Sequence, residues 1–285
     1  MSKTAFIIIT SRCNLSCSYC FYQQENFRKK KDKLSFSNLS QLINELKVNK
    51  FNEITITGGE PLLRKKITLE IIKLAADNDF NVNLNTNGLL LDQEVVKTLK
   101  QLNGFKVYLS SQYLDYFEEK YLKHLISFLP VAIIHVVTKK NLKDLEKMIK
   151  LADNFNIELI IQPAYINKGY KYFNQLSLIN LDDQELNYFK NNLKQWAENN
   201  NKKKYFNLIS SYYESGKSPN ICHMGVDDII IDSNGSVYPC FHRQDLIAGN
   251  VLKNSLGDIL INIKKFSKQI NNASCFGEHC ISLFY

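Results

Sequence analysis

Three cysteines near the start of the chain, Cys13, Cys17 and Cys20, have a spacing that suggests metal chemistry. Three thiolates can hold three irons of a 4Fe-4S cluster and leave the fourth iron open, whereas electron-carrier clusters usually have four protein cysteines. Zinc is the alternative, but a zinc site normally takes four ligands and a tighter pairwise spacing. The spacing therefore predicts a cluster with one open iron, at which a ligand can react.

The elements that must position these cysteines alternate between strands and helices over the first 165 residues, a pattern typical of a parallel sheet in an α/β fold. The cysteines follow the first expected strand, and loops at the carboxyl ends of barrel strands are where such folds place active sites. Helical patterns lie near 37 to 48, 66 to 78, 92 to 102, 116 to 128 and 142 to 155. The expected strands are Thr4 to Ile9, Glu53 to Thr57, Asn81 to Asn85, Lys106 to Ser110, Ala132 to Thr138 and Glu158 to Gln162.

The last third of the chain differs in pattern. A helical stretch from Asp182 to Tyr213 has no clear strand after it, and a Ser, Gly and Pro segment from 215 to 219 follows. Beyond it, two β-prone runs flank the Asn234-Gly235 pair, which predicts a β-hairpin. We therefore expect a core domain of residues 1–215 and a smaller domain of residues 216–285.

Composition indicates a folded protein, because 45% of the 285 residues are hydrophobic and 22% are charged. No apolar run reaches the roughly 18 residues of a membrane span, and no signal peptide is evident, so we expect a cytoplasmic protein without membrane contact. The net charge of +8 comes mostly from scattered lysines, which makes a nucleic-acid partner unlikely on sequence grounds. The dense run from Arg28 to Lys33 is interpreted as a solvated loop, with a docking patch for an acidic partner as the alternative.

The cysteine motif resembles that of the radical S-adenosylmethionine superfamily, C-x-x-x-C-x-x-C with an aromatic residue, here Tyr19, before the last cysteine. The resemblance extends to a GGEP motif after the second strand, which comprises Gly58, Gly59, Glu60 and Pro61. It implies a partial (β/α)6 barrel similar to a TIM barrel, a 4Fe-4S cluster with an open iron, and bound S-adenosylmethionine. The implied reaction is reductive cleavage to a 5′-deoxyadenosyl radical, which abstracts hydrogen from a substrate.

The resemblance also assigns the contacts to S-adenosylmethionine. The glycines let the backbone approach the ligand, and Glu60 can accept a hydrogen bond from the amino group of the methionine moiety. Arg64 is a weaker candidate for its carboxylate. Strand ends are expected to line the rest of the cofactor, with Asn85 after the third strand, Ser110 near the ribose and Gln162 near the adenine.

The remaining cysteines, Cys222, Cys240, Cys275 and Cys280, all lie in the last 64 residues. Cys222 is followed by twelve residues, Gly235, four more residues and Cys240. This spacing resembles the motif of the SPASM family and of its shortened form, the twitch domain. Four thiolates imply one auxiliary 4Fe-4S cluster, although the four residues between Cys275 and Cys280 exceed the usual C-x-x-C. The alternative is a zinc site made by the four cysteines, or by three of them with His279 or His242.

The substrate is the open question. We expect a peptide or a small molecule, with an electron donor such as flavodoxin or ferredoxin, and we favour an oxidative crosslink in a ribosomally made peptide. Two-electron dehydrogenation of a small alcohol, as in an aminoglycoside precursor, is the alternative. A two-cluster electron-transfer or scaffold protein is the alternative of another class.

A catalytic base is harder to predict. In sulfatase-maturating relatives an acidic residue stands where Phe241 stands here, so that activity is disfavoured. Asp227, Asp228 and His242 are weak candidates, and the two aspartates could equally be turn residues at the start of the hairpin.

Overall fold

A single curved sheet organises the computed structural model of the chain, which describes residues 3–24, 31–111, 119–215, 225 and 228–272. Its strand order is β6-β5-β4-β3-β2-β1-β7-β8-β9. Strands β1 to β7 run parallel, and β8 and β9 are antiparallel additions. The strands are β1 (Thr4–Ile8), β2 (Glu53–Thr57), β3 (Asn81–Thr86), β4 (Phe105–Ser111), β5 (Val131–Val137), β6 (Glu158–Pro163), β7 (Asp228–Ile231), β8 (Ser236–Tyr238) and β9 (Gly249–Asn250).

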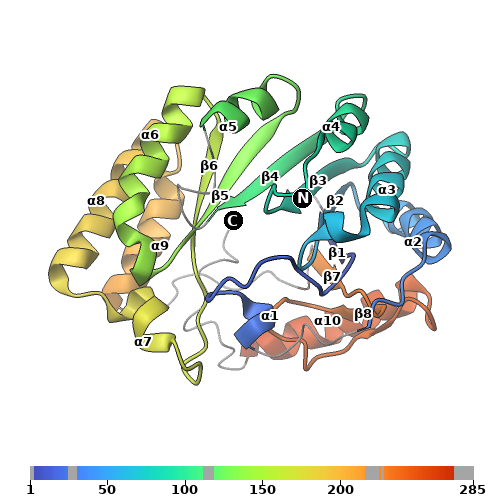
Figure 1. Cartoon of the computed structure of the whole chain (residues 1–285). Helices are drawn as coiled ribbons and strands as arrows, with labels where there is room; N and C mark the ends of the chain where they lie inside the picture. The colour runs from blue at the N-terminus through green and yellow to red at the C-terminus, as the bar shows by residue number, and fades with distance from the viewer. Residues whose placement is uncertain (1–2, 25–30, 112–118, 216–224, 226–227, 273–285) are drawn as a thin grey trace.

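Helices cover the outer face of the sheet, and its inner face is turned toward the centre of the molecule (Figure 1). This arrangement confirms the predicted α/β fold with six parallel strands in a partial barrel. The longer helices are α2 (Phe36–Val48), α3 (Lys65–Asp77), α4 (Gln93–Leu99), α5 (Glu119–Ile126), α6 (Leu145–Phe155), α8 (Asp183–Asn199), α9 (Lys203–Ser215) and α10 (Leu256–Asn272). The shorter ones are α1 (Phe21–Gln24), η2 (Pro61–Arg64), η4 (Lys139–Asp144), α7 (Phe173–Leu176) and η5 (Leu178–Asn180).

The two faces of the sheet follow from alternation along each strand. On β2, Ile54 and Ile56 are fully buried in the main core beneath the helices, whereas Thr55 and Thr57 point to the other face. Strands β3, β4 and β6 keep this alternation, so the outer face is apolar and the inner face carries polar side chains on these strands, whereas β5 is apolar on both faces except for His135. The inner face can therefore bind a polar ligand, whereas the outer face is buried beneath the helices.

The edge of the sheet at β6 is covered by helices. The hydroxyl of Tyr205 on α9 donates to the carbonyl of Ile161 at 2.6 Å, and both groups are buried. Covering an edge strand prevents it from pairing with another chain. The sequence pattern suggested one helical stretch from Asp182 to Tyr213, but the structure divides it into α8 and α9, with Asn201 at a φ of 54° between them. Asparagine tolerates this left-handed conformation better than most residues.

The predicted hairpin around Gly235 is confirmed, since β7 and β8 pair in antiparallel fashion with Ile231 opposite Val237. Strand β7 also pairs with β1 in parallel, so the described part of the C-terminal segment continues the barrel sheet. The proposed division into residues 1–215 and 216–285 remains a prediction. None of the helices in the described ranges is long and apolar enough to cross a membrane.

Candidate functional site

The loop after β1 carries Cys13, Cys17 and Cys20, whose side chains are all partly exposed. The backbone N–H of Cys20 donates to the carbonyl of Cys17 at 3.0 Å, and helix α1 begins directly after Cys20. The N–H of Leu15 donates to Cys13 Sγ at 3.4 Å, the kind of contact that also stabilises sulfur bound to iron. Within the described residues, no three Cys, His, Asp or Glu side chains gather closely enough for a single metal ion. Three thiolates on one loop suit a 4Fe-4S cluster with one open iron, whereas a zinc site normally takes four protein ligands.

Gly58 and Gly59 bring the loop after β2 against the cysteine loop. The N–H of Gly59 donates to the carbonyl of Thr10, and the N–H of Glu60 to that of Arg12, both at 2.8 Å. A Cβ atom on Gly59 would lie 2.0 Å from the carbonyl oxygen of Arg12, and one on Gly58 would lie 2.4 Å from that of Thr10. The missing side chains thus make room for the backbone of the cysteine loop; their expected approach to a ligand stays a prediction.

Glu60 is fully buried and links the ends of β2 and β3. Its Oε1 accepts hydrogen bonds from the N–H of Leu62 at 3.0 Å and the hydroxyl of Thr86 at 2.9 Å, and its Oε2 accepts one from the N–H of Asn87 at 2.9 Å. Burial raises the pKa of this carboxyl, and the three hydrogen bonds oppose the rise. Pro61 is buried at the start of η2, where a missing N–H costs nothing.

Arg64 lies at the end of η2 and binds backbone rather than facing open space. Its guanidinium donates to the carbonyls of Ile9 at 2.9 Å and Leu34 at 3.0 Å. Two of its nitrogens are thus engaged with the chain itself, and its expected contact with the carboxylate of a methionine moiety remains untested.

The basic run that we interpreted as a solvated loop contains one inward residue. Residues 28–30 lie outside the described part, but the side chain of Asp32 is only 12% exposed. It accepts from the Thr10 hydroxyl at 2.7 Å and lies 3.5 Å from Nε of Arg12. Asp32 therefore helps to hold the cysteine loop.

Three of the predicted cofactor residues share the inner face of the sheet. Asn85 on β3, Ser110 on β4 and Gln162 on β6 alternate with the buried outer residues of their strands and are partly exposed. Tyr19 reaches this face from the cysteine loop, and its phenol interacts with the side chain of Ser110. Burial, together with the charge of Cys17, raises the pKa of Tyr19 well above its ordinary value, so the phenol stays protonated at neutral pH. The structure thus joins two residues that the sequence suggested separately.

Cys240 follows β8 and is buried in a small apolar cluster on the inner face, separate from the main core. The cluster contains Ile8 of β1, Ile230 of β7 and Tyr238 of β8, and Cys20 packs against it. One cysteine from each set therefore borders the same group of side chains. Cys222, Cys275 and Cys280 lie outside the described residues.

The three candidate bases differ in position. His242 is partly buried between Phe21 and Tyr165, with ring centroids at 4.9 and 4.2 Å, and burial lowers its pKa to about 4. Asp228 is the first residue of β7 and lies opposite Thr4, at the amino end of the strands and away from the cysteine loop. Asp227 lies outside the described residues.

Sequence reasoning missed two polar residues beside the cysteines. Asn87 Nδ2 donates to Asn14 Oδ1 at 2.8 Å and lies 4.0 Å from Cys13 Sγ. The side chain of Gln24 connects α1 to Tyr165 and Asn167, which follow β6. The Asn-Thr-Asn-Gly turn after the third strand was a signal for Asn87, but nothing in the sequence marked Gln24.

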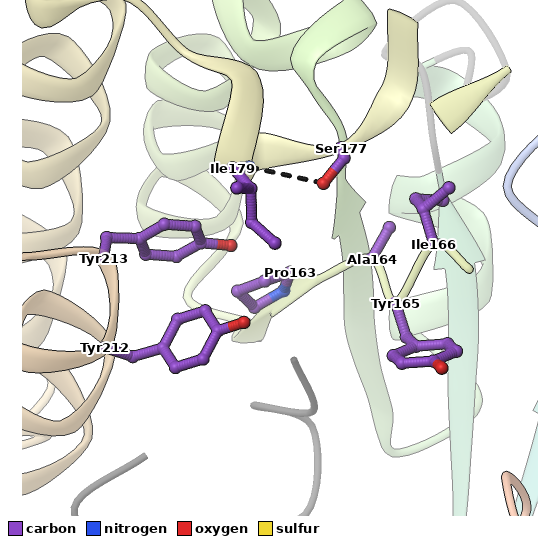
Figure 2. Close-up of a pocket in the computed structure, with 8 residues that line it drawn as sticks. All are labelled: Pro163, Ala164, Tyr165, Ile166, Ser177, Ile179, Tyr212 and Tyr213. Carbon is purple, nitrogen blue, oxygen red and sulfur yellow. Dashed lines mark hydrogen bonds between the residues drawn. The ribbon is translucent and has the colours of Figure 1, made fainter. Parts of the chain in front are cut away.

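A narrow pocket lies at the end of β6, beside this site (Figure 2). Pro163 and Ala164 form one side, and Tyr212 and Tyr213 of α9 extend toward them from the other. Tyr165 also lines the pocket, while its ring contacts His242. The pocket thus belongs to the packing behind the site.

Family models match most of these features. A model described as the radical SAM superfamily matches residues 7–152, just over half of the chain. A model described as the SPASM iron-sulfur cluster-binding domain matches residues 222–280.

Several curated proteins are similar to parts of the chain or to nearly all of it. An uncharacterized protein of Methanocaldococcus jannaschii is 28% identical over 55% of this chain and 61% of its own length. The GTP 3′,8-cyclase of Clostridium acetobutylicum is 36% identical over 36% of this chain and 33% of its own length. The sporulation killing factor maturation protein SkfB of Bacillus subtilis is 23% identical over 95% of this chain and 68% of its own length. The chain thus spans less than two thirds of the length of the first two relatives.

Solved structures share the fold at low sequence identity. Streptococcus suis SuiB with S-adenosylmethionine has a TM-score of 0.71 at 16% identity, over 90% of this chain and 65% of its own. The protein anSMEcpe with AdoMet and a peptide has a TM-score of 0.65 at 22% identity, over 98% and 88%. BtrN with AdoMet and 2-DOIA has a TM-score of 0.57 at 16% identity, over 99% and 92%.

Proposed function

Because the chain belongs to the radical S-adenosylmethionine superfamily and carries a SPASM iron-sulfur domain, we propose that it oxidatively modifies a ribosomally made peptide, by forming a crosslink. The observation that carries the proposal is the convergence of Cys20 and Cys240 on one apolar cluster of the inner face. A substrate on this face would lie between the two cysteine sets. In the proposed oxidation, a hydrogen atom leaves the substrate toward the cofactor at the first cysteine set, and an electron leaves it toward the auxiliary cluster at the second set. The substrate would therefore need to reach both sets.

The seven cysteines would form two separate cluster sites. Cys13, Cys17 and Cys20 would hold the cluster with the open iron, and Cys240 with the three other C-terminal cysteines would hold one auxiliary 4Fe-4S cluster. When bound and reduced, the first cluster and S-adenosylmethionine supply the radical that abstracts hydrogen. An electron donor such as flavodoxin or ferredoxin would deliver the electron.

Polar and apolar parts of the inner face have separate tasks. Asn85, Ser110 and Gln162 would orient the nucleoside part of the cofactor, with Tyr19 held against Ser110. The apolar cluster beneath them, with Ile8 and Ile230 fully buried, would keep water from the substrate.

A peptide substrate is favoured by two of the similar proteins. SkfB, which aligns with nearly the whole chain, is named as a maturation protein, and SuiB has also been solved with its precursor peptide SuiA. The basic surface of the chain, with a net charge of +8, would suit an acidic peptide segment. Dehydrogenation of a small alcohol is the second candidate, favoured by the alignment with 92% of BtrN.

The test uses anaerobically reconstituted protein with dithionite and S-adenosylmethionine. We expect 5′-deoxyadenosine from the wild type and none from Cys17→Ala. Co-expression with a candidate precursor peptide should yield a product lighter by two hydrogens, located by tandem mass spectrometry. If 5′-deoxyadenosine forms but only a polyol is oxidised, the peptide proposal fails; if none forms, an electron-transfer or scaffold role is favoured.

A further inference from the structure

The side chain of Gln24 joins the cysteine loop to the segment after β6, more than 140 positions away in sequence. Its Nε2 donates to the carbonyl of Tyr19 at 2.8 Å and to that of Tyr165 at 3.2 Å, and its Oε1 accepts from the N–H of Asn167 at 2.9 Å. One amide thus uses its donors and its acceptor on backbone groups of two separate segments. These three hydrogen bonds hold the cysteine loop and the segment after β6 in a fixed position relative to each other.

The contact with Tyr19 acts on a cysteine ligand. The Tyr19 carbonyl belongs to the peptide unit that joins Tyr19 to Cys20, and this unit is planar and rigid. Holding its oxygen therefore limits the direction in which the Cys20 side chain leaves the backbone. The Tyr19 side chain is held separately by Ser110 of β4. The Tyr19-Cys20 unit is thus fixed from two sides of the barrel mouth.

An aromatic cluster reinforces the same junction. Phe21, Tyr165 and His242 contact one another, with ring centroids 4.2 to 6.4 Å apart. The three rings come from α1, from the segment after β6 and from the segment after Cys240. The N–H of His242 also donates to Cys240 Sγ at 3.3 Å. Through this cluster, the position of Cys240 depends on that of the cysteine loop.

The segment after β6 is itself a firm anchor. The ring of Pro163 faces the tyrosines of α9, whereas the side chains of Ala164 and Tyr165 point away from them (Figure 2). Tyr212 is buried, and the rings of Tyr212 and Tyr213 contact each other edge to face with centroids 5.2 Å apart. Gln24 therefore ties the cysteine loop to a part of the chain that is packed on its other side.

We propose that Gln24 is a positioning residue that clamps the cysteine loop to the segment after β6 and so sets the orientation of Tyr19 and Cys20 toward the inner face. The inference rests on the proposed function, because it concerns how the cluster with the open iron meets S-adenosylmethionine. The three cysteines can bind iron without the clamp. What depends on it is the productive orientation of the bound cofactor.

The test compares reconstituted wild type with Gln24→Leu, which removes all three hydrogen bonds, and Gln24→Glu, which keeps the shape and the acceptor but loses the donors. S-adenosylmethionine is titrated into the reduced protein, and the change in the electron paramagnetic resonance spectrum is followed. Because both variants lose the two hydrogen bonds that Nε2 of Gln24 donates, we expect about tenfold weaker binding of S-adenosylmethionine in both, with unchanged iron content and a loss of about 3 °C at most in unfolding temperature.

Gln41→Leu is the matched control, because Gln41 on α2 is exposed and, among the residues that the structure describes, its side chain donates to Glu45 alone. This variant should bind S-adenosylmethionine like the wild type. Wild-type binding in both Gln24 variants would overturn the proposal. So would a parallel loss of iron and unfolding temperature, which would indicate a general structural role. The readout does not involve a peptide, so failure of the proposed substrate would leave this result standing.

Discussion

Replacing Gly59 by alanine tests how closely the GGEP motif packs against the cysteine loop. The new Cβ would lie 2.0 Å from the carbonyl oxygen of Arg12 and 2.8 Å from that of Ser11. Since real Cβ contacts are essentially never under 3.0 Å, one backbone must move by about 1 Å. That movement breaks the hydrogen bonds from Gly59 to Thr10 and from Glu60 to Arg12, both 2.8 Å long.

The cost follows from these contacts. Two hydrogen bonds contribute about 1 kcal/mol each, and overpacking adds about 1 to 3 kcal/mol, so we expect a destabilisation of about 4 kcal/mol. For a chain of this size that corresponds to about 10 °C in the unfolding temperature, measured by circular dichroism. Iron content after reconstitution should fall as well, because Arg12 adjoins Cys13.

The control for this variant is Gly257→Ala on α10, where a new Cβ would have the Ser255 hydroxyl at 3.9 Å as its neighbour. Its unfolding temperature should stay unchanged or rise slightly, because alanine favours the helix. If Gly59→Ala matched this control in both stability and iron content, the close packing of the two loops would be refuted.

Three further outcomes follow from the buried polar groups. Glu60→Gln replaces one carboxylate oxygen by an N–H₂ group, which would face a backbone N–H that now donates to that oxygen. We therefore expect the free energy of unfolding, measured in urea, to fall by about 2 kcal/mol. Burial lowers the pKa of His135, a fully buried residue of β5, to about 4 from its ordinary 6.5, so as pH falls the unfolded state takes up its proton first and this residue contributes a loss of about 2 kcal/mol between pH 7 and pH 5. Because burial lowers the pKa of His242 in the same way, His135→Leu should remove about half of the pH dependence that the two histidines cause. Ser110→Ala and Tyr19→Phe should each weaken S-adenosylmethionine binding, and because the two side chains interact, the double variant should lose less than the sum of the two losses; additive effects would contradict the pairing.

The parallel strands could be predicted closely because their signals are local. Predicted and observed limits agree at Glu53–Thr57 and differ by one residue at either end of the fourth and fifth strands. Short buried runs of Ile and Val, separated by amphipathic helices, leave few alternatives for β2 or β5. The break at Asn201 was missed because a helical pattern continues on both sides of it.

The site was predictable in its cysteines and less so in its supporting contacts. Cys13, Cys17 and Cys20 carry their chemistry in their spacing, and Glu60 stands in a recognisable motif. The partners of Glu60 come from a different strand end, 26 and 27 residues away at Thr86 and Asn87. No local pattern specifies such partners, because a carboxylate accepts from whichever donors the fold brings to it.

Strand register, rather than the cysteine motifs, brings Cys20 and Cys240 to the same apolar cluster. Ile230 pairs with Phe6 on one side and with Tyr238 on the other, so the inner face of the hairpin continues the inner face of β1. Cys240, two residues beyond Tyr238, then shares that face. A slip of one residue would turn the side chains of β8 to the outer face, because alternate residues point to opposite sides. The Asn-Gly turn predicted that a hairpin exists, whereas only its parallel pairing with β1 brings Cys240 to the same apolar cluster as Cys20.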